Sequence, residues 1–257
     1  MNPPPIVMVH GAFCSGWVFD TFQAPFAAAG HRVIAPDLPG HGAHEPPLAA
    51  AGRSMGDYVR AIASLAGSVE APPVLIGHSL GGLVALLAAA EAPTAGVILL
   101  SPSPPWGVAG GTMEEAISAL SLYALGPYWA LPIAPDYPTF RRYCVDRLER
   151  SERRALFERL THESGRAIFE TLNWWLDPFL TTLARPERIG VPILVISGAR
   201  DALHPTATAR DTARRLGARL EVMPQMSHWL IGEPGWEAVA DRCLAWLSGQ
   251  AAPLAAE

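Results

Sequence analysis

A serine at position 79 is flanked by glycines in the pattern Gly-x-Ser-x-Gly, over residues 77–81. An apolar run at 73–76 precedes this pattern, and an alanine-rich apolar stretch at 83–90 follows it. This order predicts a strand, a sharp turn and a helix, with the serine hydroxyl projecting from the turn. Glycines two positions before and after the serine remove side chains that would collide in so tight a turn. The sequence therefore predicts Ser79 as a nucleophile; a plain Gly-Ser turn between strand and helix is the alternative.

A base and a carboxylate are needed beside such a serine, because a hydroxyl is a poor nucleophile until its proton is removed. Asp201 lies shortly after an apolar run at 192–198, and His228 lies shortly after the next run, at 219–223. The carboxyl ends of parallel strands meet at one edge of a sheet, so we expect both side chains to lie near Ser79. Serine, acid, histidine is also the chain order that this strand–turn–helix arrangement uses.

Simpler roles exist for both partners. Asp201 is also placed to cap the helix that follows it, and His228 is also compatible with an ordinary loop histidine. His204 lies so near Asp201 that we do not expect it to bridge to the serine. The loop after the apolar run at 96–100 contains no carboxylate, which removes a competing position for the acid. We therefore predict a catalytic triad of Ser79, Asp201 and His228.

Two backbone N–H groups are expected to bind the oxyanion that forms when the serine attacks a carbonyl. Leu80 directly follows the serine, and the expected helix after it points its N-terminus, which favours negative charge, at the site. The loop after the first apolar run, at 6–9, supplies the second donor from Ala12 or, alternatively, from Phe13. Gly11 allows this backbone to approach the serine closely.

Six short apolar runs alternate with stretches of helical periodicity along the chain. Fully apolar runs are typical of parallel strands that are buried on both faces. Alternation at this spacing predicts an α/β fold, with a mostly parallel six-stranded sheet and helices on both faces. The strands are expected at 6–9, 32–35, 73–76, 96–100, 192–198 and 219–223, and the helices at 17–29, 54–66, 83–90, 205–216 and 236–247.

The character of the sequence changes in an insert at 102–185. Prolines cluster there, apolar runs disappear, and arginine and glutamate become dense at helical spacing over 141–166, as on a solvated helix surface. We expect residues 1–101 and 186–257 to form the core and the insert to form a helical cap over the carboxyl edge of the sheet. Most of its aromatic side chains should pack between helices, and a few should line an apolar pocket. These aromatics are Trp106, Tyr123, Tyr128, Trp129, Tyr137, Phe140, Phe169, Trp174, Trp175 and Phe179.

Composition excludes several kinds of chemistry. All 19 basic residues are arginine, so Schiff-base catalysis, a P-loop lysine and lysine-bound pyridoxal are excluded. The net charge of −5 disfavours a nucleic-acid partner, which requires a basic face. The three cysteines, Cys14, Cys144 and Cys243, form neither a disulfide framework nor a metal-ligand pair, and no metal or cofactor is expected. No signal peptide or membrane-spanning run is visible, which predicts a cytoplasmic protein without membrane attachment.

These motifs resemble those of serine esterases in the α/β-hydrolase superfamily. The resemblance covers nearly the whole chain outside the insert, and it implies the α/β-hydrolase fold, carboxylesterase-type chemistry and a cap. The shortened start of the sheet is similar to the branch that contains methylesterases and hydroxynitrile lyases. The motifs are His-Gly-Ala at 10–12 with Trp17, Asp-Leu-Pro-Gly-His-Gly at 37–42, Gly-His-Ser-Leu-Gly-Gly at 77–82, Gly-Ala-Arg-Asp at 198–201 and Ser-His at 227–228.

Departures from related enzymes narrow this resemblance. The lyases carry threonine at the position of Gly11 and lysine directly after the catalytic histidine, where this chain has Trp229. Cyanohydrin cleavage is therefore not expected. Haloalkane dehalogenases and related epoxide hydrolases use an aspartate at the position of Ser79. The resemblance thus favours ester cleavage.

We therefore expect a serine hydrolase that cleaves carboxylic esters of small, largely apolar molecules through an acyl-enzyme intermediate. Phe13 and Trp229 are expected to contact the substrate. Two alternatives remain on the same fold: a non-catalytic small-molecule receptor, and a carbon–carbon bond hydrolase or thioesterase with the same triad. A complete triad favours an enzyme, because a receptor needs none of it.

Overall fold

The computed structural model of the 257-residue chain describes residues 3–109 and 126–249. Its centre is a six-stranded sheet in which every neighbouring pair is parallel, in the order β2-β1-β3-β4-β7-β8. All residues of β1, β3 and β4 are buried, as expected from their apolar runs. This confirms the predicted fold. The strands are β1 (Ile6–Val9), β2 (Val33–Ile34), β3 (Val74–His78), β4 (Gly96–Leu100), β7 (Ile193–Gly198) and β8 (Arg219–Met223).

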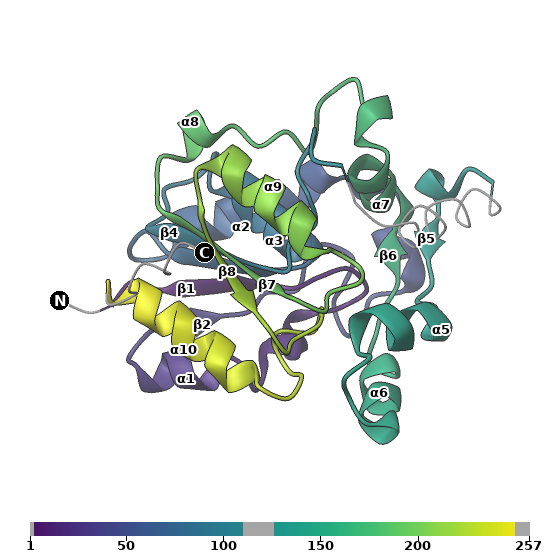
Figure 1. The fold of residues 1–257 in the computed structure, drawn as a ribbon. Coiled ribbons are helices and arrows are strands. Elements are labelled where there is room, and N and C mark those ends of the chain that lie inside the picture. The colour runs from purple at the N-terminus through teal and green to yellow at the C-terminus, as the bar shows by residue number, and fades with distance from the viewer. Residues whose placement is uncertain (1–2, 110–125, 250–257) are drawn as a thin grey trace.

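Helices cover both faces of this sheet (Figure 1). On one face lie α2 (Met55–Ser68), α3 (Leu80–Ala88) and α9 (Thr206–Leu216); on the other lie α1 (Ala24–Ala28) and α10 (Trp236–Leu247). Helix α2 begins with a capping box between Ser54 and Asp57. Helix α3 is buried along its whole length, which explains why its sequence is apolar all round.

The stretch at 17–29, predicted as one helix, is divided. It forms a 3-10 helix, η1 (Gly16–Phe19), then a turn, and then the five-residue α1. Pro25 explains the break, because proline is tolerated only in the first turn of a helix and α1 therefore starts beside it. Phe19, Phe22 and Phe26 nevertheless form a continuous, fully buried row.

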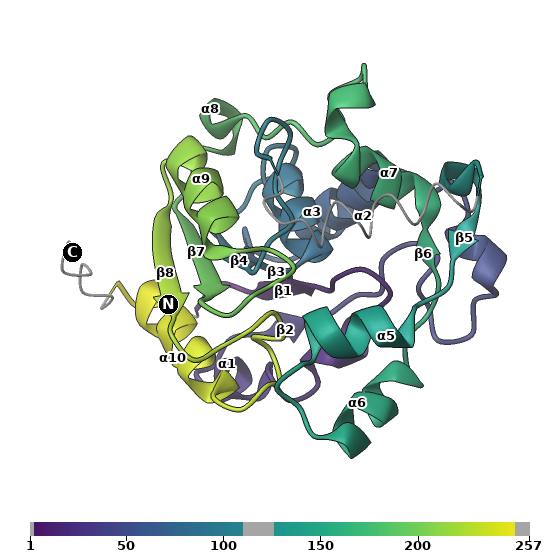
Figure 2. The same cartoon turned by 45° about the vertical axis from the view of Figure 1, so that its right-hand side comes forward.

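The described part of the insert gathers at one end of the sheet (Figure 2). A pair of antiparallel strands, β5 (Pro132–Ile133) and β6 (Glu163–Ser164), corrects the expectation of an insert without strands. Residues 110–125, with Tyr123, lie outside the described part of the chain. The other elements are η3 (Tyr128–Ala130), α5 (Tyr137–Thr139), the π-helical η4 (Phe140–Cys144), α6 (Arg150–Phe157), α7 (Gly165–Leu172) and η5 (Trp174–Leu176), followed by α8 (Pro186–Ile189) after the insert.

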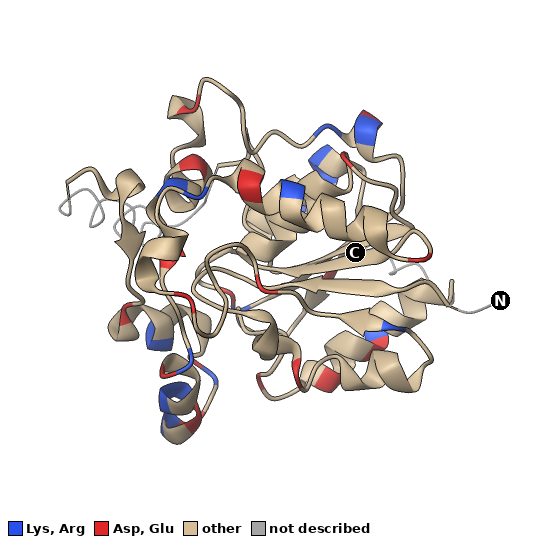
Figure 3. Cartoon of the chain, turned by 180° about the vertical axis from the view of Figure 1, so that it is seen from behind, with Lys and Arg blue, Asp and Glu red and all other residues tan. Residues whose placement is uncertain are grey.

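Ribbon positions of charged residues lie mainly outside the central sheet, and α6 carries blue and red residues together (Figure 3). No residue of α6 is buried, which fits the predicted solvated surface. Among residues 3–109 and 126–249, no helix combines the length and apolar character needed to cross a membrane.

Candidate active site

Ser79 occupies the sharp turn between β3 and α3. Its backbone angles, φ 55° and ψ −123°, lie in a region that residues with a side chain rarely adopt. A Cβ on Gly77 would lie 2.2 Å from the carbonyl oxygen of Gly81, and a Cβ on Gly81 would lie 2.2 Å from the carbonyl oxygen of His10. Both positions therefore require glycine, and the predicted strand, turn and helix around the serine are present.

His228 and Asp201 form a buried pair. His228 Nδ1 lies 2.9 Å from Asp201 Oδ2, and the other carboxylate oxygen accepts the N–H groups of Leu203, at 2.9 Å, and His204, at 2.8 Å. Burial alone would raise the pKa of Asp201, but His228 and the His204 N–H overcome this and hold that pKa below its ordinary value. Asp201 is therefore a carboxylate that orients the imidazole and also fixes the turn before α9.

The loop that carries His228 is hydrogen-bonded to His78, the residue directly before Ser79. His78 Nε2 donates to the carbonyl oxygen of His228 at 2.9 Å, and the two ring centroids are 5.0 Å apart. Burial, and then the neighbouring His228, lower the pKa of His78 to about 3, so His78 is a neutral donor. No hydrogen bond joins Ser79 Oγ to His228 in the described residues, so proton transfer between them stays a prediction. Such contacts often tighten only when substrate binds.

The first loop lies directly against the nucleophile. A Cβ on Gly11 would be 3.0 Å from Ser79 Cβ, so glycine at this position leaves the loop in close contact with the serine. Within the described residues, neither the Ala12 nor the Leu80 amide donates a hydrogen bond to another protein group. The Phe13 amide, by contrast, donates to Glu163 Oε2 at 3.2 Å. Of the two alternatives in this loop, Ala12 is the one whose N–H is left for a ligand.

Sequence reasoning did not anticipate the role of His204. Its Nε2 lies 3.1 Å from Ser103 Oγ, and its ring centroid is 5.2 Å from that of His228. The Ser103 amide in turn donates to the carbonyl oxygen of Ser79 at 3.0 Å. Burial, followed by His228, lowers the pKa of His204 to about 4, so this ring is neutral. His204 thus packs against His228 without adding charge, and its place three residues after Asp201 was the available signal.

Glu163, from β6 of the insert, is also absent from the sequence-based site. It is completely buried and accepts four hydrogen bonds: from His41 Nε2 at 3.1 Å, Tyr58 Oη at 2.7 Å, the Phe13 amide at 3.2 Å and the Ser164 amide at 2.7 Å. Burial alone would raise the pKa of Glu163, but His41 and these donors lower it. The carboxylate is therefore charged and fully bonded.

Trp229 is only 4% exposed, and its ring packs edge-on against His78 and Phe140 at centroid distances of 5.5 and 6.3 Å. Its predicted substrate contact stays a prediction.

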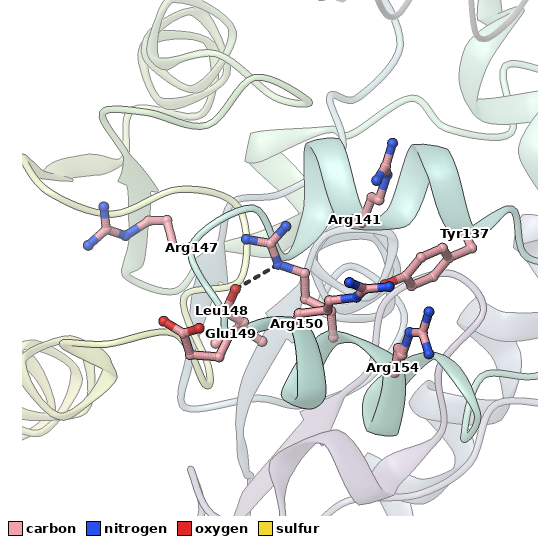
Figure 4. A pocket seen from close by; sticks show the side chains of 8 residues that line it. Tyr137, Arg141, Arg147, Leu148, Glu149, Arg150 and Arg154 are labelled. Atoms are coloured by element: carbon pink, nitrogen blue, oxygen red, sulfur yellow. Dashed lines mark hydrogen bonds between the residues drawn. The ribbon is translucent and has the colours of Figure 1, made fainter.

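A hollow of about 650 Å³ on the insert contains no member of the predicted triad (Figure 4). It is lined by charged residues, and Arg153 Nε there donates to the Leu148 carbonyl at 2.6 Å.

Comparisons with known proteins identify the family and the fold. A model of the alpha/beta hydrolase family matches residues 6–242. The magnesium-chelatase 30 kDa subunit of Rhodobacter capsulatus is 28% identical over 259 residues, covering 96% of this chain and 87% of that protein. A pimeloyl-acyl-carrier-protein methyl ester esterase of Xanthomonas campestris pv. campestris is 32% identical over 228 residues, covering 82% of each.

Solved structures share the fold at lower identity. A methylesterase from Arabidopsis superposes with a TM-score of 0.73 at 20% identity, covering 96% of this chain and 99% of that one. Tomato methylketone synthase I, solved with 2-tridecanone, gives a TM-score of 0.75 at 17% identity, covering 97% of this chain and 100% of that one.

Proposed function

The chain belongs to the alpha/beta hydrolase family, and we propose that it hydrolyses carboxylic esters with Ser79 as the nucleophile. One observation carries this proposal: the His228–Asp201 pair, at 2.9 Å, is bonded to the turn on which Ser79 stands. A serine on a strained turn, a histidine and a buried carboxylate are the parts that acyl transfer requires. A receptor on the same fold would not need them.

The proposed reaction has two steps. His228 takes the proton of Ser79 as the hydroxyl oxygen attacks the ester carbonyl, and the resulting imidazolium protonates the leaving alcohol. His228 then removes a proton from water as the water attacks the acyl-enzyme carbonyl, and it returns that proton to Ser79 Oγ as the acid is released. Asp201 keeps the Nδ1 proton on the side away from the serine and stabilises the imidazolium. The lowered pKa of Asp201 supports this role, because it favours the carboxylate form that accepts a hydrogen bond from the imidazole.

The developing oxyanion is proposed to bind the amides of Leu80 and Ala12. Leu80 opens α3, so its N–H lies at the positive end of the helix dipole. The proposal favours Ala12 over Phe13, since the Phe13 amide already donates to Glu163. Preorganised donors of this kind act on the transition state more than on the substrate.

The proposed substrates are carboxylic esters of small, largely apolar molecules, with the insert as a cap over them. Phe13 and Trp229 are retained as proposed substrate contacts. The pimeloyl-acyl-carrier-protein methyl ester esterase and the Arabidopsis methylesterase are both named for methyl ester cleavage. A methyl or other short alkyl ester is therefore the first substrate class to test.

Ester hydrolysis by wild type and two serine variants tests the proposal. Ser79→Ala should lower kcat for p-nitrophenyl butyrate and for a methyl ester panel by several orders of magnitude. Ser197→Ala is the matched control, because Ser197 is a fully buried serine of β7 whose Oγ, among the described residues, donates only to the neighbouring Gly198 carbonyl. Wild-type-like turnover by Ser79→Ala would contradict the proposal. Thioesters and β-diketones in the same panel separate ester cleavage from thioester and carbon–carbon cleavage.

A further inference from the structure

Phe13 has an unusual backbone beside the proposed oxyanion donor. Its φ of 63° lies in the left-handed region, which a residue with a large side chain seldom adopts. It directly follows Ala12, and its loop closes in a tight turn in which the Cys14 amide donates to the Gly11 carbonyl at 3.3 Å. A conformation of this kind persists only where its surroundings hold it.

Both backbone groups of Phe13 are held by the insert. Its N–H donates to Glu163 Oε2 at 3.2 Å, and its carbonyl oxygen accepts the Thr161 N–H at 2.8 Å. Thr161 lies two residues before Glu163, and Glu163 is the first residue of β6. Residues 161–163 of the insert therefore hydrogen-bond both the N–H and the carbonyl oxygen of Phe13.

The carboxylate that grips Phe13 is itself immobilised from the core. Tyr58 of α2 donates to Glu163 Oε1 at 2.7 Å, and His41 donates to Oε2 at 3.1 Å. The His41 ring lies in turn against the rings of Tyr58 and His10, at centroid distances of 5.6 and 5.1 Å. A fully buried acceptor with four fixed donors has one position available to it.

We propose that Glu163 is a positioning residue for the oxyanion hole: it holds Phe13 so that the Ala12 amide faces the oxygen that becomes charged at Ser79. This inference rests on the proposed function. Glu163 does not touch the substrate; it acts through the Phe13 amide on the residue before it. The insert therefore completes the catalytic machinery as well as covering it, because the loop after β1 takes its active form only with β6 in place.

Glu170 provides a matched control for this proposal. It is also a buried glutamate of the insert, in α7, and it also accepts a core amide, that of Met55 at 2.8 Å. Its second oxygen accepts Arg166 Nε at 2.8 Å. Glu170 joins the insert to the start of α2, and among the described residues it makes no hydrogen bond or ion pair with the loop at 10–14. A merely structural role for Glu163 predicts that the two glutamates behave alike.

The experiment compares Glu163→Gln, Glu163→Asp and Glu170→Gln with wild type at a temperature where each is folded by circular dichroism. Ester turnover, KM and inhibition by a boronic acid, which forms a tetrahedral adduct with the serine oxygen, are measured. Loss of a whole oxyanion donor costs 10²–10³ in kcat, so a displaced donor should cost about tenfold or more. We expect this loss in kcat and in boronate affinity for both Glu163 variants, with KM changed less than about twofold. Glu170→Gln should keep wild-type kcat.

Glu163→Asp keeps the negative charge beside His41 but cannot reach all four donors, so it serves also if Glu163→Gln does not fold. Equal kcat and equal boronate affinity in folded Glu163 variants and in Glu170→Gln would overturn the positioning role while leaving the proposed function intact. A wild-type protein that neither hydrolyses esters nor binds the boronate would overturn the proposed function, and this inference with it.

Discussion

The described residues contain two buried histidine–carboxylate pairs, and the two are built differently. In the core, His228 and Asp201 meet at 2.9 Å; between core and insert, His41 and Glu163 meet at 3.1 Å. Asp201 receives its other hydrogen bonds from the amides of Leu203 and His204, within three residues of itself. The first pair is thus completed by its own loop.

The second pair joins distant parts of the chain. The remaining donors to Glu163 are Tyr58, 105 residues away, and Phe13, 150 residues away, besides the adjacent Ser164. A histidine and a carboxylate are therefore proposed to serve the reaction in the first pair, whereas in the second pair they join distant segments of the chain. In the proposed reaction, His228 differs from His41 in presenting its second ring nitrogen to a nucleophile.

Asp201→Asn should show the difference between the two pairs most clearly, because it should lower kcat while the protein stays folded. The amide can offer its N–H to Nδ1 and so favour the wrong tautomer, which is expected to lower kcat by about 10⁴. Ester turnover and thermal unfolding measure the two effects, and the protein should stay folded. A loss of kcat below about tenfold in a folded variant would mean that Asp201 does not serve His228 in the reaction.

Glu163→Gln should lower the free energy of unfolding strongly and kcat far less than Asp201→Asn does. Removing one member of a buried ion pair leaves the other unpaired, so the free energy of unfolding should fall by roughly 3 kcal/mol. Its effect on kcat should stay far smaller than that of Asp201→Asn. Urea unfolding of wild type, Glu163→Gln and Asp201→Asn checks the ranking. A stability equal to that of wild type would contradict the role assigned to the second pair.

The pH dependence of stability sharpens the comparison further. Burial alone would lower the pKa of His41, but Glu163 raises it above 6.5, so this stabilisation is complete below pH 6.5 and is lost as pH rises through the folded-state pKa. The pKa of Glu163 lies below 4.5, so its contribution is present above pH 4.5 and is lost as pH falls through the folded-state value.

The stability difference between wild type and Glu163→Gln should therefore be greatest between about pH 4.5 and 6.5 and should shrink toward alkaline pH, by at most about 1.4 kcal/mol per pH unit. Unfolding free energies measured at pH 5, 6, 7, 8 and 9 provide the check. A difference that stays constant over this series would show that the pair does not carry the linked proton.

The core pair and the sheet were accessible from the sequence for physical reasons. Buried parallel strands must be apolar on both faces, so β1, β3, β4 and β7 stand out as runs, and loops at their carboxyl ends converge. Ser79, Asp201 and His228 could be located from those ends alone. The break before α1 was less visible, because the aromatic spacing continued across it.

The second pair could not be found in this way. Glu163 lies in an arginine- and glutamate-rich stretch where an acidic residue resembles a solvated surface, and its partners are 122 and 105 residues away. Strands β5 and β6 have two residues each, which is too short for any periodicity to appear. These contacts form only when the insert packs against the core, and that packing leaves no pattern in the neighbouring sequence.

Mapping the site of covalent modification tests the central claim most directly. Wild type and His228→Ala are treated with a fluorophosphonate, and the modified peptide is identified by mass spectrometry. We predict a single adduct on Ser79 of wild type, formed at least about 10³-fold more slowly in His228→Ala. An unmodified wild-type serine, or an adduct on another residue, would contradict the assignment of Ser79 as the activated nucleophile.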